Sequence, residues 1–191
     1  YPDAVIAVAS DHGFAATDTE INLFSPFIDA GLITLDADGK VKAWEAMPWP
    51  SSGSAAIVLA RPDDKALEAR VKALLDTLKA NPEARIGAVA DRAEIARMDG
   101  NPQASFYVNF GPGALAGGFK GAKAPLVSPS KYKGTHGYFP AAPEMRSTFM
   151  MMGKGVPKAR NLGELDMRQI APTLARLLKV KLSKTEARPV L

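Results

Sequence analysis

Two short turns, each followed by a glycine, carry the residues best suited to chemistry. Asp11 and His12 stand together before Gly13, and His136 stands before Gly137. A carboxylate beside an imidazole suits a divalent transition metal, most often zinc. The alternative is an ordinary turn, in which Asp11 bonds its own backbone and His12 lies at the surface. The chain contains 2 His in all, and each begins a His-Gly-aromatic triplet, which favours the metal hypothesis.

The element that must position the first turn is the apolar run Val5–Ala9. Its β-branched residues, between Pro2 and Gly13, predict a short strand buried on both faces. Asp11 and His12 would then follow its carboxyl end, where ligands collect in open α/β sheets. We expect this strand to be central and to share its sheet with a second apolar strand, Ala55–Leu59.

The strongest helix signal lies between Asp64 and Ala80. Its apolar residues follow the spacing of one helical face, which predicts that this face packs on the sheet; they are Leu67, Val71, Leu74, Leu75 and Leu78. An earlier helix is expected from Thr19 to Ala30, capped by Thr17 or Asp18 and ended by Gly31.

The remaining pattern alternates short strands, turns and helices, which indicates an α/β protein. We expect strands at 32–35, 41–44, 86–89, 105–110 and 148–152, a loop at 48–53, a helix capped by Asp91 that runs to Met98, and a terminal helix from Asp166 to Leu178. The methionines of 148–152 are expected to fill the core. Residues 117–134 are expected to form a long loop, which suggests a lid or a functional excursion.

Composition indicates one ordinary globular domain over residues 1–191. Hydrophobic residues make up 47% of the chain and charged residues 23%. No apolar run approaches the roughly 20 residues of a membrane span, so none is expected. With 0 Cys, any metal must be held by His and carboxylates. The absence of Cys and a start at Tyr1 favour a mature, periplasmic or secreted protein over a cytoplasmic one.

The charge distribution argues against nucleic-acid binding. The net charge is only +4 and the basic residues are dispersed, apart from Lys120, Lys123, Lys131 and Lys133. A nucleic-acid binder more often shows a dense basic face with interleaved aromatics. We interpret this lysine-rich segment as a solvated connection, with attraction of phosphate-bearing substrates as the alternative.

Widely separated motifs together resemble the type I phosphodiesterase/nucleotide pyrophosphatase family of the alkaline phosphatase superfamily. They are Ser10–Phe14 followed by Ile21–Leu23, then Gly134–Tyr138, Met145–Phe149 and Asp166–Leu174. The resemblance implies part of an alkaline-phosphatase-like sheet flanked by helices. It also implies that residues 1–191 are the carboxyl-terminal half of a catalytic domain, whose upstream half would be their partner.

By this resemblance the intact protein would be a hydrolase of phosphodiester or pyrophosphate bonds in nucleotides or similar small molecules, with two zinc ions. Asp11 and His12 would bind the zinc that touches the nucleophile, and His136 would bind the other. The two histidines would therefore lie at the same end of the sheet. The Thr or Ser nucleophile and the other ligands would lie upstream. Thr17 and Thr135 are interpreted as turn or cap residues rather than substitutes.

Two kinds of alternative stay open. The same metal ligands would serve a phosphomonoesterase, a phosphonate hydrolase or a metal-dependent phosphoglycerate mutase of that superfamily. In a different class, the 191 residues alone would be a catalytically silent fragment, because three ligands cannot complete two sites that want about four each.

Overall fold

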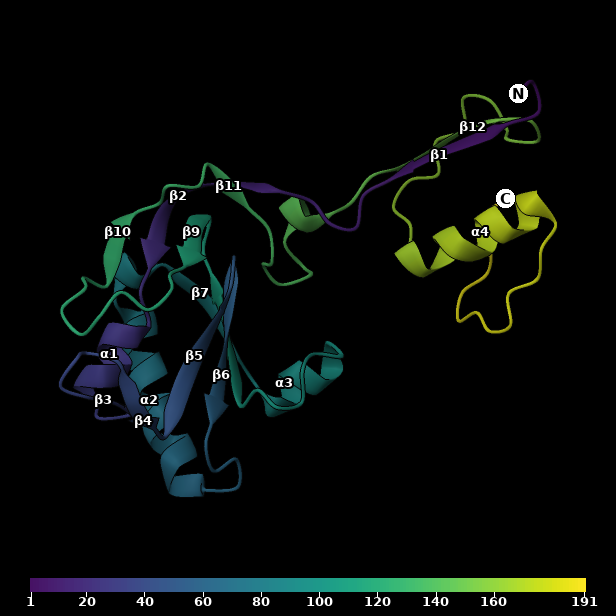
Figure 1. Ribbon diagram of the computed structural model, residues 1–191. Coiled ribbons are helices and arrows are strands. Elements are labelled where there is room, and N and C mark those ends of the chain that lie inside the picture. The colour runs from purple at the N-terminus through teal and green to yellow at the C-terminus, as the bar shows by residue number, and fades with distance from the viewer. The chain divides into compact units, whose positions relative to one another are not determined.

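The computed structural model describes all residues, 1–191, and has a mixed α/β fold (Figure 1). The chain divides into two compact units. The terminal unit comprises Tyr1–His12 and Ser147–Leu191, and the central unit comprises Gly13–Arg146. None of the helices combines the length and the apolar character that a membrane crossing requires.

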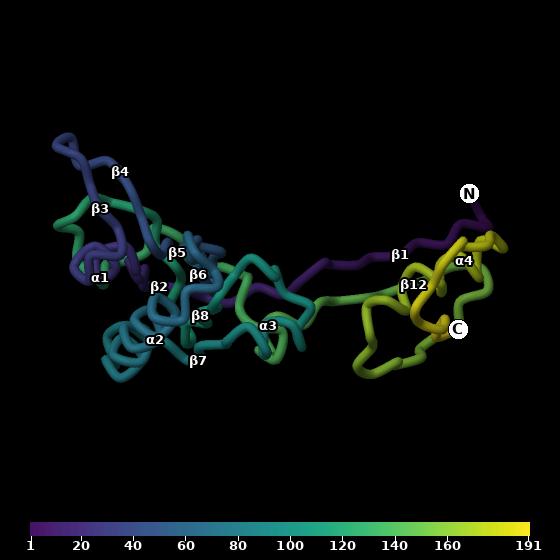
Figure 2. The backbone as a smooth tube through the Cα atoms, turned by 90° about the horizontal axis from the view of Figure 1, so that it is seen from below, coloured from purple at the N-terminus to yellow at the C-terminus, as the bar shows by residue number.

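The terminal unit contains a two-stranded ribbon and a helix. Strand β1 (Val5–Ala9) pairs antiparallel with β12 (Phe149–Gly153) along its whole length. Figures 1 and 2 show the two strands side by side. A 3-10 turn, η3 (Met167–Gln169), leads into α4 (Ile170–Leu178). The Asp166 side chain caps η3 by accepting from the Arg168 backbone N–H at 2.9 Å. The predicted strand 148–152 and the predicted terminal helix are thus confirmed.

The environment predicted for Val5–Ala9 is wrong, although the strand is there. Ile6 and Val8 are 55% and 53% exposed, where burial on both faces was expected. β1 pairs with β12 alone, and Ala55–Leu59 belongs to a different sheet, so the strand is not central to a shared one. Met150 and Met152 are exposed as well, so the expected methionine core is also wrong. A ribbon of two strands has no further layer that could bury its apolar side chains.

The main sheet of the central unit is antiparallel, in the order β5-β6-β8-β7. Its strands are β5 (Ala46–Ser51), β6 (Ser54–Leu59), β7 (Ile86–Asp91) and β8 (Phe106–Phe110). Helix α2 (Lys65–Ala80) contributes to the larger core beside Ile57. Helix α3 (Arg92–Arg97) packs through Ile95 in a second cluster with Ala56. Because successive strand residues point to opposite faces, the two helices cover opposite faces of the sheet.

Helix α2 forms as the sequence predicts. The Asp64 side chain caps it by accepting from the Leu67 backbone N–H at 3.0 Å. Four residues of its apolar face are buried: Leu67, Val71, Leu75 and Leu78. The helix ends at Asn81, which leads into the 3-10 turn η1 (Pro82–Ala84). The predicted helix after Asp91 is also confirmed, because Asp91 and Glu94 form a capping box at the start of α3.

In a second sheet, three strands each pair with β2 (Ala15–Ile21). β9 (Gly113–Ala116) runs parallel to β2, while β10 (Val127–Pro129) and β11 (Gly134–Thr135) run antiparallel to it. The predicted Thr19–Ala30 helix is therefore wrong in its first part, since helix α1 covers only Phe24–Asp29. Alternating β-branched residues in this segment favour a strand. The expected loop 117–134 contains β10.

Two further predictions concern residues 32–53. The predicted strands at 32–35 and 41–44 are confirmed as β3 (Ile33–Leu35) and β4 (Val41–Trp44), which pair antiparallel. The loop expected at 48–53 is wrong for residues 48–51, which include Pro48 and Pro50 and lie within β5, and is confirmed for the turn at Ser52 and Gly53. β5 is the edge strand of its sheet, where a missing N–H costs no ladder hydrogen bond.

Candidate functional site

Asp11 and His12 follow β1 as predicted, in the terminal unit. Ser10, the residue before the turn, forms two hydrogen bonds with Thr148 that fix the turn. The Ser10 N–H donates to the Thr148 carbonyl at 3.0 Å, and the Thr148 N–H donates to Ser10 Oγ at 2.9 Å. The Asp11 carboxylate also accepts from the His12 backbone N–H at 3.1 Å. These bonds hold the carboxylate close to the next side chain.

The side chains of Asp11 and His12 lie within ion-pair distance of each other. Asp11 Oδ2 lies 3.6 Å from His12 Nε2, and the Asp11 side chain is open to solvent. Two ligands of one tetrahedral zinc, at about 2.0–2.1 Å each, lie about 3.3 Å apart. The observed separation is close to this value and is also typical of an ion pair, so the assignment of Asp11 and His12 as zinc ligands stays a prediction.

His136 is positioned by a well-anchored turn of the central unit. The preceding residue, Thr135, is buried and pairs with Ala15 in the β2–β11 ribbon. The His136 carbonyl accepts from the Gly53 N–H at 2.7 Å. Beyond the turn, the Tyr138 hydroxyl donates to the Ala114 carbonyl at 2.7 Å. The backbone that carries the His136 side chain is therefore fixed by contacts both before and after this residue.

Glycines make this turn feasible. Gly137 has φ +78°, and a Cβ added to it would lie 2.6 Å from the Ser51 carbonyl oxygen. At Gly53 a Cβ would lie 2.5 Å from the Tyr138 ring, which instead packs against the bare backbone. Burial of Tyr138 raises the pKa of its hydroxyl, and Glu144 raises it further. The Tyr138 phenol therefore serves here as a neutral hydrogen-bond donor.

The three predicted ligands fall in different units. Asp11 and His12 belong to the terminal unit and His136 to the central unit, so their convergence on one site stays a prediction. Neither unit contains a group of three or more His, Asp or Glu side chains placed to hold a metal ion. Of the three residues, Asp11 and His12 are the two whose side chains lie close together, at 3.6 Å.

Thr17 and Thr135 are structural residues. Both are buried, and both lie in paired strands, not at the turn or cap positions expected from the sequence. The Thr17 hydroxyl donates to the Gly113 carbonyl at 2.8 Å. Neither hydroxyl is presented as a nucleophile.

The lysine-rich segment makes local interactions. Lys120 forms an ion pair of 2.9 Å with Glu20, and the Lys131 ammonium lies 5.3 Å from the centre of the Tyr132 ring. Ion pairs and cation–π contacts of this kind are ordinary on a solvated surface. They agree with the interpretation of the segment as a connection.

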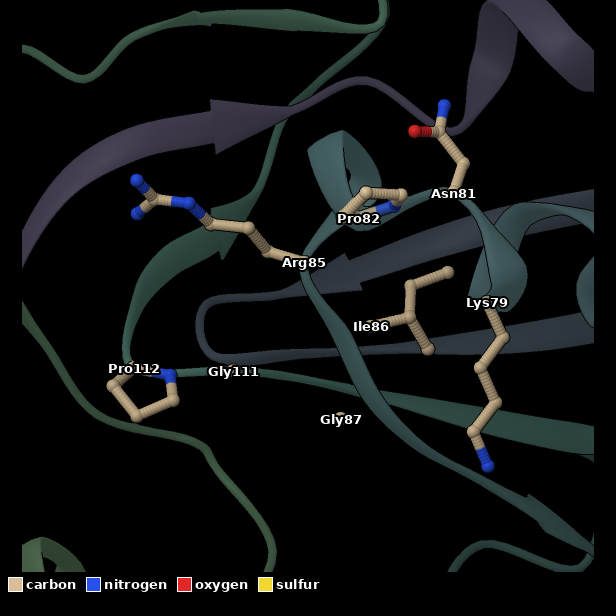
Figure 3. Close-up of a pocket in the computed structure, with 8 residues that line it drawn as sticks. All are labelled: Lys79, Asn81, Pro82, Arg85, Ile86, Gly87, Gly111 and Pro112. Carbon is tan, nitrogen blue, oxygen red and sulfur yellow. The ribbon is translucent and has the colours of Figure 1, made fainter.

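A pocket that sequence analysis did not single out lies beyond the end of α2 (Figure 3). It has a volume of about 390 Å³ and is lined by Lys79, Asn81, Pro82, Arg85, Ile86, Gly87, Gly111 and Pro112. Figure 3 shows the side chains of Lys79 and Arg85 extending in different directions. Arg85 is engaged by Asp18 at 3.1 Å. The lining contains no carboxylate, imidazole or hydroxyl, so the pocket offers neither metal ligands nor a nucleophile.

Comparison with known proteins identifies the fold. No protein-family model and no curated protein matches the sequence. Among solved structures, human ectonucleotide pyrophosphatase/phosphodiesterase 5 matches with a TM-score of 0.63 and 17% identity, over 96% of this chain and 42% of that one. The murine protein matches with the same score and identity, over 96% of this chain and 43% of that one. An inactive form of the murine protein in complex with AMP matches with a TM-score of 0.62 and 17% identity.

These matches cover only part of each solved structure. The chain spans less than half the length of each of the three structures. Within that span the likeness includes nearly all of the 191 residues, in both units. The chain therefore has part of an alkaline-phosphatase-like α/β fold, and this part is similar to less than half of ectonucleotide pyrophosphatase/phosphodiesterase 5.

Proposed function

We propose that this chain is part of a zinc-dependent hydrolase that cleaves phosphodiester or pyrophosphate bonds in nucleotides or similar small molecules. The observation that carries the proposal is the Asp11–His12 pair, whose oxygen and nitrogen lie 3.6 Å apart directly after a strand. Carboxylate and imidazole are ligands that zinc accepts. The likeness to nucleotide pyrophosphatase/phosphodiesterase 5, including a form in complex with AMP, supports the substrate class.

The proposed roles follow from the donor atoms. Asp11 and His12 would hold one zinc, and His136 would contribute a ligand to a second. Zinc in such sites lowers the pKa of a bound hydroxyl or water and stabilises negative charge on phosphate oxygens. The residues themselves orient the ligand atoms: the Ser10–Thr148 bonds fix the first turn, and the Gly53–His136 bond fixes the second. The nucleophile and the other ligands would come from the upstream half of the catalytic domain.

The test uses the full-length protein that contains this chain. Zinc content would be measured by mass spectrometry. Hydrolysis would be measured with bis(p-nitrophenyl) phosphate as the substrate. Asp11→Ala and His12→Ala should abolish turnover, because each removes a ligand from the zinc that activates the nucleophile. His136→Ala should lose activity that added zinc partly restores. Asp38→Asn, which changes an exposed acid in the β3–β4 turn, should leave turnover unchanged.

Comparison of two substrates separates the proposal from its alternatives. A diesterase should prefer bis(p-nitrophenyl) phosphate to p-nitrophenyl phosphate, whereas a phosphomonoesterase of the same superfamily should show the reverse preference. Full activity in Asp11→Ala together with unchanged zinc content would exclude the assigned site altogether.

A further inference from the structure

The face of the ribbon that carries His136 is defined by its register. β11 pairs with β2 so that Gly134 lies opposite Ala16 and Thr135 opposite Ala15. The Thr17 N–H donates to the Lys133 carbonyl at 3.2 Å, which continues the same register at one end. Phe14 and His136 lie one residue beyond the ends of β2 and β11, and extending the register by that residue would set them opposite each other. Opposite residues of an antiparallel pair share a face.

Burial separates the two faces of this ribbon. Thr17 and Thr135, on one face, are only 5% and 7% exposed. Phe14 is 66% exposed, and His136 is exposed as well. Phe14 and His136, which the extended register assigns to the other face, are therefore both exposed.

The Phe14 ring lies against the ribbon and does not project freely into solvent. A Cβ added to Gly134 would overlap the edge of the ring at Cε1, so the ring rests on the backbone where a side chain is absent. Gly134 is diagonal to Phe14 in the register, at a distance that an aromatic side chain can span. One side of the ring is thereby supported, and Phe14 is 66% exposed in this chain.

We propose that Phe14 is a specificity-determining residue that receives a planar ring of the phosphoester substrate. This assignment rests on the proposed function, since it needs the phosphate group to lie near His136. A ring on the substrate could stack on Phe14 or meet it edge to face, which adds to the gain from burying its apolar area. Substrates whose ester group is a small alkyl chain would lack this contact.

The test compares phenyl phosphate with methyl phosphate as ligands of the full-length protein, with dissociation constants from isothermal titration calorimetry. The wild-type protein should bind phenyl phosphate more tightly. Phe14→Ala should weaken phenyl phosphate roughly twofold to tenfold, as expected for the loss of an aromatic pair, and should leave methyl phosphate unchanged. Phe14→Tyr, which keeps the ring, should retain the preference for phenyl phosphate.

Tyr132→Ala provides the matched control, since it removes another exposed aromatic ring of the central unit from outside the β2–β11 pairing. It should alter neither constant. A wild-type protein that does not discriminate between the two ligands would overturn the assignment of Phe14, as would a Phe14→Ala variant that keeps the preference or loses both ligands equally. Hydrolysis of bis(p-nitrophenyl) phosphate by the wild-type protein tests the proposed function separately, so the two failures are distinguishable.

Discussion

At the residue scale, the placement of His136 depends on the glycine that follows it. Gly137 combines a left-handed backbone with close approach to the Ser51 carbonyl. Each requirement alone disfavours a side chain. Because the Gly53 N–H bonds to the His136 carbonyl in the same turn, any displacement of Gly137 also moves the imidazole.

Gly137→Ala should therefore be more damaging than a left-handed glycine alone would explain. We expect the free energy of unfolding to fall by about 1–3 kcal/mol, measured by urea denaturation, with reduced activity in the full-length protein. Gly39→Ala is the matched control, since Gly39 has φ +75° but nothing within 4 Å of an added Cβ. Equal losses in the two variants would show that contact with Ser51 is unimportant.

At the element scale, α2 is held by one face. Leu75 is fully buried, while its neighbour Leu74 is half-buried and packs at the margin of the same core. The two leucines have the same helix propensity and differ mainly in burial. Replacing each leucine in turn therefore separates the contribution of core packing to stability from that of helix propensity.

Leu75→Ala should lower the free energy of unfolding by about 2–5 kcal/mol, because it leaves a cavity in the core. Leu74→Ala should cost clearly less. Urea denaturation followed by circular dichroism would measure both. Similar costs would mean that α2 does not pack on the sheet through the face described above.

Elements whose signals are local could be predicted from the sequence. The Asp64 cap and the leucine spacing of α2 are examples, as is the Asp91–Glu94 capping box. The predicted Thr19–Ala30 helix wrongly includes Thr19–Ile21, the end of β2, because the strand depends on pairing with β9, β10 and β11, which are supplied by residues 113–135. The exposure of β1 likewise depends on which strands lie beside it, and an apolar run in the sequence does not indicate those neighbours.

The same distinction applies to the candidate site. The proximity of the Asp11 and His12 side chains could be predicted, because adjacent residues in one turn need no partner to be placed together, whereas their role as metal ligands stays a prediction. The position opposite His136 that the extended register gives Phe14 could not be predicted, because it follows from a register that joins segments about 120 residues apart. Long-range strand pairing was the missing information in both cases.

At the scale of the whole molecule, a group of carboxylates links stability to pH. The Thr19 hydroxyl, and then Arg85, lower the pKa of Asp18 from its ordinary value of 3.8. Arg61 and Arg70 lower the pKa of Glu45 from 4.5. The Leu67 N–H and Arg61 lower the pKa of Asp64. Each group binds protons less readily in the folded chain than in the unfolded one.

The sign of the pH effect follows from these directions. The stabilisation is complete above the ordinary carboxyl pKa values and is lost as the pH falls through the lowered folded values. The urea midpoint should therefore decrease from about pH 6 to about pH 3. Glu45→Gln should reduce that decrease, whereas Glu83→Gln, at an exposed acid outside these contacts, should not. A midpoint that rises on acidification would contradict the assigned shifts.

The isolated chain should differ from the full-length protein in metal binding. Asp11 and His12 supply two ligands to one zinc, and His136 supplies one to the other, so neither site is complete. We expect the 191 residues alone to purify largely free of zinc and to show no diesterase turnover, while the full-length protein is active. Stoichiometric zinc and turnover in the isolated chain would show that it completes its own site.

The ribbon of β1 and β12 gives the molecule a chemical vulnerability. β12 contains three consecutive methionines, and Met150 and Met152 present their thioethers to solvent. Peroxide converts such thioethers to sulfoxides, which are polar and chiral and no longer pack as an apolar side chain does. Any partner surface that covers this ribbon would shield those sulfur atoms, so the oxidation rate of Met150 and Met152 is a direct chemical readout of whether the ribbon is covered.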